Sequence, residues 1–170
     1  TEMARAAEIL GIEHRWIGFM DSGLPEGDPL PPLSFGSFGT LPLEQAAAPL
    51  VRLVREYRPH IILSYDEVGG YPHPDHIMSH KVAVEAYEKA GDSEAYVGEG
   101  EPWKPLKLYY DRAFNPERTV ALHEYLLDQR GESVFEGFIE HMAHRFNDAQ
   151  DGTRHETTTR ILCSDYFIHR

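Results

Sequence analysis

The chain has 170 residues, of which 41% are hydrophobic and 26% are charged, as is typical of one globular domain with a single core. Its formal net charge of −12 argues against binding to nucleic acid or to an anionic membrane, because their phosphates repel a protein of that sign. A lone cysteine excludes a disulfide within the chain and suits a reducing compartment. No apolar run approaches the length of a membrane span.

Apolar periodicity predicts alternating helices and strands in the first half of the chain. In order, the pattern indicates a helix at about 2–10, a strand at about 13–19, a long loop, a helix at about 43–57, a strand at about 60–65 and a helix at about 75–90. This alternation predicts an α/β fold, with a Rossmann-like, mostly parallel sheet flanked by helices.

The second half continues with a polar loop at about 91–101 and then four further elements. We expect a strand near 107–112, helices near 116–130 and 133–147, and a strand near 157–163. Cys163, at the end of the last strand, is interpreted as a small buried side chain. No repeat or low-complexity tract interrupts the chain, so we expect a single domain over 1–170.

The predicted helix at about 43–57 has an apolar stripe on one face. The residues of this stripe recur at spacings of three and four, which is the period of a buried helical face. Pro49 lies within the same segment, and it predicts either the first turn of a shorter helix or a kink. The stripe consists of Leu43, Ala46, Ala47, Leu50, Val51, Val54 and Tyr57.

The stretch from Tyr65 to His76 gathers reactive side chains in a Gly/Pro-rich turn that follows a predicted strand. Open α/β sheets bind their ligands at the carboxyl ends of strands, so this turn is the candidate site. The spacing of His73 and His76 lets two imidazoles converge on a metal. That spacing alone does not separate a metal site from capping and turn residues. Because Cys163 is the only cysteine, a closed structural zinc site is not expected.

The stretch as a whole resembles the GlcNAc-phosphatidylinositol de-N-acetylase (LmbE-like) superfamily of zinc amide hydrolases, through its Tyr-Pro-His-Pro-Asp-His string. The resemblance extends to segments 18–25, 54–59, 100–103 and 107–110. These flanking segments resemble the mycothiol S-conjugate amidase branch. Pro72 favours the same branch, because the related deacetylases usually carry Gly at that position.

The resemblance implies a role for each polar residue of the motif. His76 would be a zinc ligand, and His73 would stabilise the oxyanion and protonate the leaving amine, with Asp75 as its orienting partner. Tyr71 would polarise the scissile carbonyl. For Asp75 the alternative is an N-cap of the following helix, and the two interpretations are compatible.

The resemblance also assigns Asp21, in the loop at about 21–41, to hydrogen bonds with sugar hydroxyls of a glucosaminyl-inositol group. The alternative for Asp21 is an Asx-turn with the Ser-Gly that follows it. His80 lies four residues after His76, but we do not expect it to be a ligand, because no Glu follows His76. Asp66 and Glu67 either shape the turn or contact substrate, and the sequence does not decide between these roles.

One family motif has no counterpart in these 170 residues. In the family, Ala-His-Pro-Asp-Asp-Glu supplies a second His ligand, an Asp ligand and the Asp general base, and this chain contains no such string. The chain is therefore either a degenerate homologue or a piece of a longer enzyme. We expect the second, because the sequence begins at Thr1 inside a predicted helix. The family's first strand is central, so we also expect a sheet incomplete at its amino-terminal side, which by itself exposes apolar strand edges and folds poorly.

These observations lead to one hypothesis and two alternatives. The hypothesis is Zn²⁺-dependent hydrolysis of the amide in mycothiol S-conjugates, which are small-molecule thiol glycosides, releasing a mercapturic acid and glucosaminyl-inositol in the cytoplasm. The first alternative is a de-N-acetylase of N-acetylglucosaminyl-inositol that uses the same catalytic groups. The second, of another class, is a non-catalytic sugar-binding or partner-binding domain. The oligomeric state is left open.

Overall fold

The structure, a computed structural model, describes residues 1–111, 116–139 and 157–162. The chain divides into two compact units, one formed by Ile17–Phe114 and the other by Thr1–Trp16 together with Asn115–Arg170. The first unit contains the candidate site. Its elements are η1 (Phe38–Thr40), α2 (Leu43–Tyr57), β1 (Ile61–Tyr65), α3 (Pro74–Lys89) and β2 (Lys107–Asp111).

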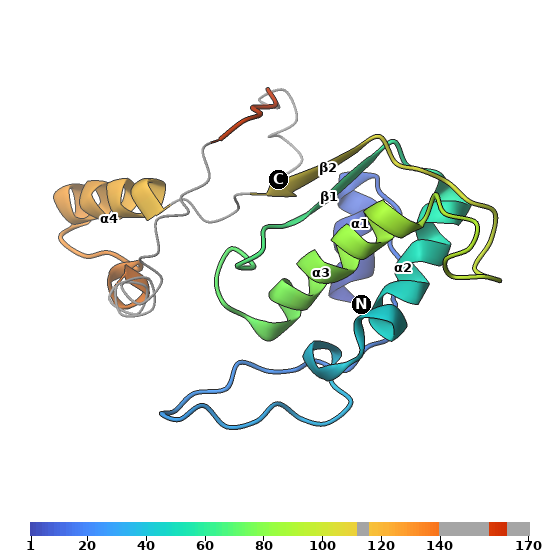
Figure 1. Ribbon diagram of the computed structural model, residues 1–170. Coiled ribbons are helices and arrows are strands. Elements are labelled where there is room, and N and C mark those ends of the chain that lie inside the picture. The colour runs from blue at the N-terminus through green and yellow to red at the C-terminus, as the bar shows by residue number, and fades with distance from the viewer. Residues whose placement is uncertain (112–115, 140–156, 163–170) are drawn as a thin grey trace. The chain divides into compact units, whose positions relative to one another are not determined.

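Strands β1 and β2 form a parallel pair, with Ile61 opposite Lys107 and Tyr65 opposite Asp111. Helix α3 connects the two strands and packs on β1, and α2 packs in turn on α3 (Figure 1). Parallel neighbours need such a crossover, because a tight hairpin can join only antiparallel strands. The α/β fold, with a parallel sheet flanked by helices, is therefore confirmed, as are the predicted helices and strands between residues 43 and 112.

The core of this unit lies between α2 and α3. One cluster joins Ala46 and Ala47 of α2 to Met78 and Val82 of α3. A second cluster joins Val51 and Val54 to residues at the other end of α3, and Ile62 of β1 packs against it. The central part of the predicted stripe is thus buried, whereas Leu43 and Tyr57 at its two ends are exposed. The small alanine side chains let the two helices approach closely.

Helix α2 runs through Pro49 without a break, so Pro49 does not begin a shorter helix. Proline lacks an N–H group and leaves the carbonyl four residues earlier without its helical partner. The burial of Ala46, Ala47, Val51 and Val54 on both sides of Pro49 supplies the packing that keeps the helix continuous.

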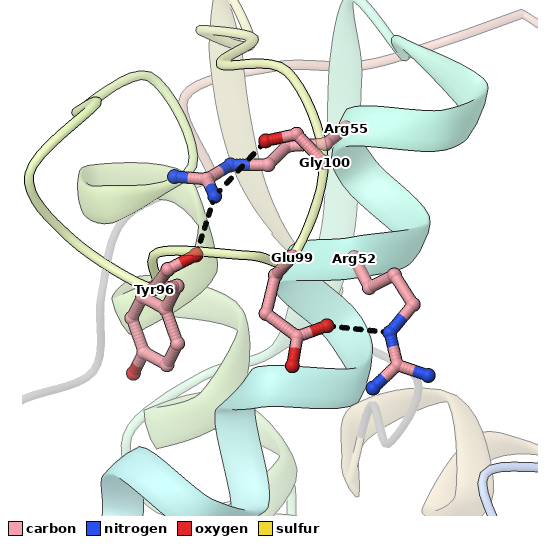
Figure 2. A network of polar contacts seen from close by, with 5 residues as sticks. All are labelled: Arg52, Arg55, Tyr96, Glu99 and Gly100. Carbon is pink, nitrogen blue, oxygen red and sulfur yellow. Dashed lines mark hydrogen bonds and ion pairs between the residues drawn. The ribbon is translucent and has the colours of Figure 1, made fainter.

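Arg55 of α2 organises the loop that follows α3. Its side chain is only 4% exposed, and all five N–H donors of the guanidinium are used. Figure 2 shows two of the bonds, those to Tyr96 and Gly100, beside an ion pair between Arg52 and Glu99 at 2.5 Å. The accepting carbonyls, at 2.8–3.3 Å, belong to Ala90, Asp92, Ala95, Tyr96 and Gly100. Among the described residues no carboxylate pairs with Arg55, and its buried charge is instead stabilised by the dipoles of five backbone carbonyls.

The strand expected at about 13–19 does not form. In this region the structure has only an isolated bridge between Met20 and Ser37, with the Phe38 N–H donating to the Met20 carbonyl at 2.8 Å. An alternating apolar pattern becomes a strand only when a neighbouring strand satisfies its backbone groups. No described strand pairs with residues 13–19, so that prediction was wrong here.

The second unit contains α1 (Glu2–Leu10) and α4 (Pro116–Arg130), which confirms both predicted helices. The Thr1 hydroxyl caps α1 by accepting the Ala4 N–H at 3.3 Å, and Gly11 ends it in a left-handed conformation with φ 65°. Of the helix expected at 133–147, the described part is helical over 136–139, and residues 140–147 lie outside the described residues. Residues 157–162 form no strand, contrary to expectation, and Cys163 also lies outside the described residues.

One side of β1 carries exposed apolar residues. Ile61 is 54% and Leu63 is 68% exposed, whereas Ile62 between them packs against the helices. These side chains lie on a face of the sheet, which parallel sheets normally cover, so they do not test the expectation of exposed strand edges. Among the described helices, none is both long and apolar enough to cross a membrane.

Candidate active site

The turn between β1 and α3 is shaped by Asp66 and two glycines. The Asp66 carbonyl accepts the Gly69 N–H at 3.0 Å, and its carboxylate accepts the Gly70 N–H at 2.9 Å. Gly69 and Gly70 have φ values of 73° and 72°, a left-handed conformation that favours glycine. Of the two roles left open for Asp66, the structure therefore shows the shaping of the turn.

Helix α3 begins with the motif itself. Pro74 occupies the first turn, and His73 is the N-cap, whose Nδ1 accepts the Asp75 N–H at 3.1 Å. The alternative interpretation of Asp75 as the N-cap was therefore wrong, because Asp75 already lies inside the helix. Since Nδ1 of His73 accepts a hydrogen bond, a neutral His73 ring carries its proton on Nε2.

His76 has the opposite arrangement. Its Nδ1 lies 2.9 Å from the Gly69 carbonyl oxygen, and a carbonyl can only accept, so Nδ1 is the donor. The lone pair on Nε2 of a neutral His76 is then available to bind a metal ion. The His76 ring also stacks on Tyr65, with centroids 4.1 Å apart and planes 9° apart.

Tyr71 and the two imidazoles form one aromatic cluster. The Tyr71 ring lies 4.7 Å from the His76 ring and 5.9 Å from the His73 ring, edge-on to both. The two imidazole centroids are 5.1 Å apart. All three side chains are half-buried, so they are held by packing and still reach solvent. The structure brings three of the predicted site residues together.

Asp75 ties this cluster to the long loop. Its Oδ2 accepts the Ser22 N–H at 3.1 Å, while its buried Oδ1 has no hydrogen-bond partner among the described residues. The hydrogen bond between Asp75 and His73 uses the backbone N–H of Asp75. Asp75 therefore contacts His73 through its main chain and the loop through its side chain.

Asp21 lies next to the residue that Asp75 holds. Its own carboxylate accepts the Gly23 N–H at 2.6 Å, which confirms the Asx-turn. Ser22 is buried, and its hydroxyl accepts the Gly39 N–H at 2.7 Å, so Ser22 joins both ends of the loop to α3. Sequence reasoning missed Ser22, because its partners are 17 and 53 residues away along the chain.

His80 lies one helical turn after His76 but makes a different contact. Its Nδ1 is 3.0 Å from the Tyr65 carbonyl, and its ring is 5.0 Å from the Tyr110 ring. Partial burial raises the pKa of Tyr110, and the nearby charges of Glu67 and Glu88 raise it further. An open hollow of about 320 Å³ lies beside Tyr65, lined also by Leu63, Ser64, Ser79 and Asp111, and no motif histidine lines it.

Within the described part of the chain, no group of three or more His, Cys, Asp or Glu side chains is placed to hold a metal ion. His76 fits the chemistry of a zinc ligand, because its Nδ1–H is bonded to a carbonyl and its Nε2 is left free. The residues described here thus supply one suitable ligand and do not complete a site.

Comparison with known proteins gives a consistent result. The family described as PIG-L: GlcNAc-PI de-N-acetylase matches residues 1–87. The chain is 48% identical to the mycothiol S-conjugate amidase of Streptomyces coelicolor, over 98% of this chain and 56% of that protein.

Deacetylases are also similar to the chain. It is 41% identical to the 1D-myo-inositol 2-acetamido-2-deoxy-alpha-D-glucopyranoside deacetylase of Streptomyces avermitilis, over 68% of this chain and 40% of that protein. It is 33% identical to a deacetylase of the same name, number 1, from Frankia alni, over 98% of this chain and 57% of that protein. The chain therefore spans about half the length of these curated relatives.

Proposed function

Because the chain belongs to the GlcNAc-PI de-N-acetylase family, we propose that it forms part of a zinc-dependent hydrolase that cleaves the amide bond of mycothiol S-conjugates. The products are a mercapturic acid and glucosaminyl-inositol. The protein acts in the cytoplasm in this proposal, on a small thiol glycoside.

The observation that carries the proposal is that the two motif histidines are held in opposite neutral tautomers. Backbone groups leave His73 with a proton on Nε2 and His76 with a lone pair on Nε2. One imidazole of each kind suits amide hydrolysis at a metal, because one can donate to the developing oxyanion while the other binds the ion. A pair of histidines serving only as structural residues does not require opposite tautomers.

The zinc ion, when bound, lowers the pKa of water and polarises the scissile carbonyl. His76 is the residue of this chain that would hold it. In this proposal the remaining ligands, and the general base that takes the proton of the attacking water, lie outside the residues described here, among which no three or more His, Cys, Asp or Glu side chains are placed to hold a metal ion.

His73 then acts on the substrate directly. Its Nε2–H donates a hydrogen bond to the oxyanion as the carbonyl carbon becomes tetrahedral. To protonate the nitrogen when the C–N bond breaks, His73 must first become doubly protonated, which releases the Asp75 N–H from its Nδ1; the proton is the one that the general base took from the attacking water. Water supplies the OH of the new acid, and the nitrogen leaves as a free amine. Tyr71, edge-on to both imidazoles, donates a hydrogen bond from its hydroxyl to the carbonyl oxygen that becomes the oxyanion.

Asp21 binds the sugar in this proposal. The Asx-turn uses one of its oxygens, Oδ1, and the carboxylate is exposed, so acceptor capacity is left for sugar hydroxyls. Asp21 is held near the motif, because the N–H of the next residue, Ser22, donates a hydrogen bond to the Asp75 carboxylate.

The amidase is preferred over the deacetylase for two reasons. Identity is higher to the Streptomyces amidase, at 48% over nearly the whole chain, than to either deacetylase, at 41% and 33%. The chain also carries Pro72 in the motif turn.

The test is a competition between two amides. The complete gene product containing this chain is given a mycothiol S-conjugate and N-acetylglucosaminyl-inositol side by side, and release of the free amine is followed for each. The proposal expects a higher kcat/KM for the conjugate, and a His73→Gln variant slower by about 100-fold or more on both substrates. Faster cleavage of the acetyl substrate would establish the deacetylase instead. Binding of the glycoside without cleavage of either amide would establish the binding domain.

A further inference from the structure

Gly69 makes the closest approach in the site. A Cβ atom added at Gly69 would lie 2.7 Å from Cβ of His76, 3.0 Å from the Tyr71 carbonyl oxygen and 3.1 Å from the Ile77 nitrogen. These are backbone or near-backbone atoms that cannot move aside. The turn can therefore bring its carbonyl to His76 only because residue 69 has no side chain.

Two independent contacts restrain the His76 ring. The hydrogen bond from Nδ1 to the Gly69 carbonyl fixes which edge of the ring faces the turn. The parallel stack on Tyr65, with planes 9° apart, fixes the tilt of the ring. Together they determine the direction of the Nε2 lone pair. The Gly69 carbonyl is itself fixed, because Asp66 accepts the Gly69 and Gly70 N–H groups.

From this geometry we propose that Gly69 and Tyr65 are positioning residues for His76, which hold its imidazole in the Nδ1–H tautomer and so leave the Nε2 lone pair for the metal that His76 would bind. This inference rests on the proposed role of His76 as a ligand. Asp66 supports it by fixing the turn that presents the carbonyl. Partners of this kind, which hold a ligating histidine, typically change metal affinity by about 10- to 100-fold when they are lost.

The decisive comparison uses two glycine variants. Gly69→Ala places a methyl group against His76, whereas Gly98→Ala introduces the same residue at another left-handed glycine, with φ 91° and no atom within 4 Å of the added Cβ. The control therefore carries the backbone strain without the contact.

The first readout needs no metal. Long-range ¹⁵N–¹H spectra of the metal-free complete protein, at a pH where imidazoles are neutral, report which ring nitrogen carries the proton. Wild type and Gly98→Ala should show His76 as the Nδ1–H tautomer, and Gly69→Ala should show a mixture of tautomers. The second readout is zinc affinity, expected to fall about 10- to 100-fold in Gly69→Ala and to be unchanged in Gly98→Ala.

A second pair of variants covers the case in which Gly69→Ala does not fold. Tyr65→Phe keeps an aromatic ring against His76 and should bind zinc as wild type does, while Tyr65→Leu should bind it more weakly. Wild-type zinc affinity and unchanged His76 signals in Tyr65→Leu, and also in Gly69→Ala if that variant folds, would overturn the inference. Failure of the wild-type protein to bind zinc would instead overturn the proposed function. The tautomer spectra would still test whether Gly69 and Tyr65 position the His76 ring.

Discussion

At the scale of single residues, the site depends on which ring nitrogen of His73 and of His76 carries the proton, and backbone hydrogen bonds determine this. The sequence identified His73, His76, Tyr71, Asp75 and Asp21, and the structure places the first three in one cluster. Their hydrogen-bond roles could not be predicted, because they depend on an N-cap at His73 and on a turn that brings Gly69 to His76. Ser22 was missed for a related reason, since nothing local in the sequence pairs it with Asp75.

The Asp75 carboxylate provides the first prediction. Asp75→Ala removes the acceptor of the Ser22 N–H, so the loop containing Asp21 loses its attachment to α3, at a cost of about 1 kcal/mol. Asp75→Asn keeps an oxygen that can accept the same hydrogen bond. Hydrogen exchange of the Ser22 amide should therefore be faster in Asp75→Ala and near wild type in Asp75→Asn. Equal protection in both variants would contradict this function of the carboxylate.

At the scale of elements, the segments with strong apolar periodicity formed as predicted, whereas the segment at 13–19, which no described strand pairs with, did not form its predicted strand. Helix α2 was recognised from its apolar stripe, whose centre packs on α3 and keeps the helix continuous across Pro49. The segment at 13–19 has a strand-like pattern, yet a strand also needs a partner that the pattern does not encode. The role of Arg55 was hidden as well, because its five acceptors are carbonyls, which every residue carries.

Arg55 provides the second prediction. Arg55→Met leaves up to five carbonyls without their donor, and each buried acceptor left unsatisfied typically costs about 1–3 kcal/mol. Arg52→Gln, one turn away on the same helix, removes only an exposed ion pair and should leave the unfolding free energy almost unchanged. Chemical denaturation measures both variants. A similar small effect from each would show that the loop after α3 does not depend on the guanidinium.

Tyr96, in the same loop, gives a prediction about alkaline pH. Burial raises its pKa above the ordinary 10.0, and the hydrogen bond to Glu85 raises it further. A raised pKa means that the folded state holds the proton more tightly than the unfolded state does. The stabilisation from Tyr96 is therefore complete below about pH 10 and is lost as the pH rises beyond it.

Denaturation midpoints at pH 8 and pH 11 test this effect. The wild type should lose more stability over the interval than Tyr96→Phe, which has no hydroxyl to ionise. Some loss should persist in the variant, because the pKa of Tyr110 is also raised. Identical losses in the two proteins would contradict the assignment to Tyr96.

At the scale of the whole molecule, the motif lies where parallel sheets place their chemistry, at the carboxyl end of β1. In the proposed function, the described residues contribute one metal ligand (His76), a proton donor (His73) and the loop that carries Asp21, which Asp75 attaches to α3. The same sheet exposes Ile61 and Leu63, although parallel sheets are normally covered on both faces. Since the chain spans about half the length of its relatives, we assign the activity to the complete protein.

The central claim is that His76 binds the zinc ion that hydrolysis requires, and metal content measured with His80 as the control tests it most directly. His80 lies one turn further along α3 and also has its Nδ1 bonded to a carbonyl, so His76→Gln and His80→Gln are matched changes on one helix. The complete wild-type protein and His80→Gln should each contain about one zinc ion per chain, as expected of a mononuclear catalytic site. His76→Gln should lose both the metal and the amidase activity. Zinc retained in His76→Gln, or absent from the wild type, would contradict the proposed mechanism.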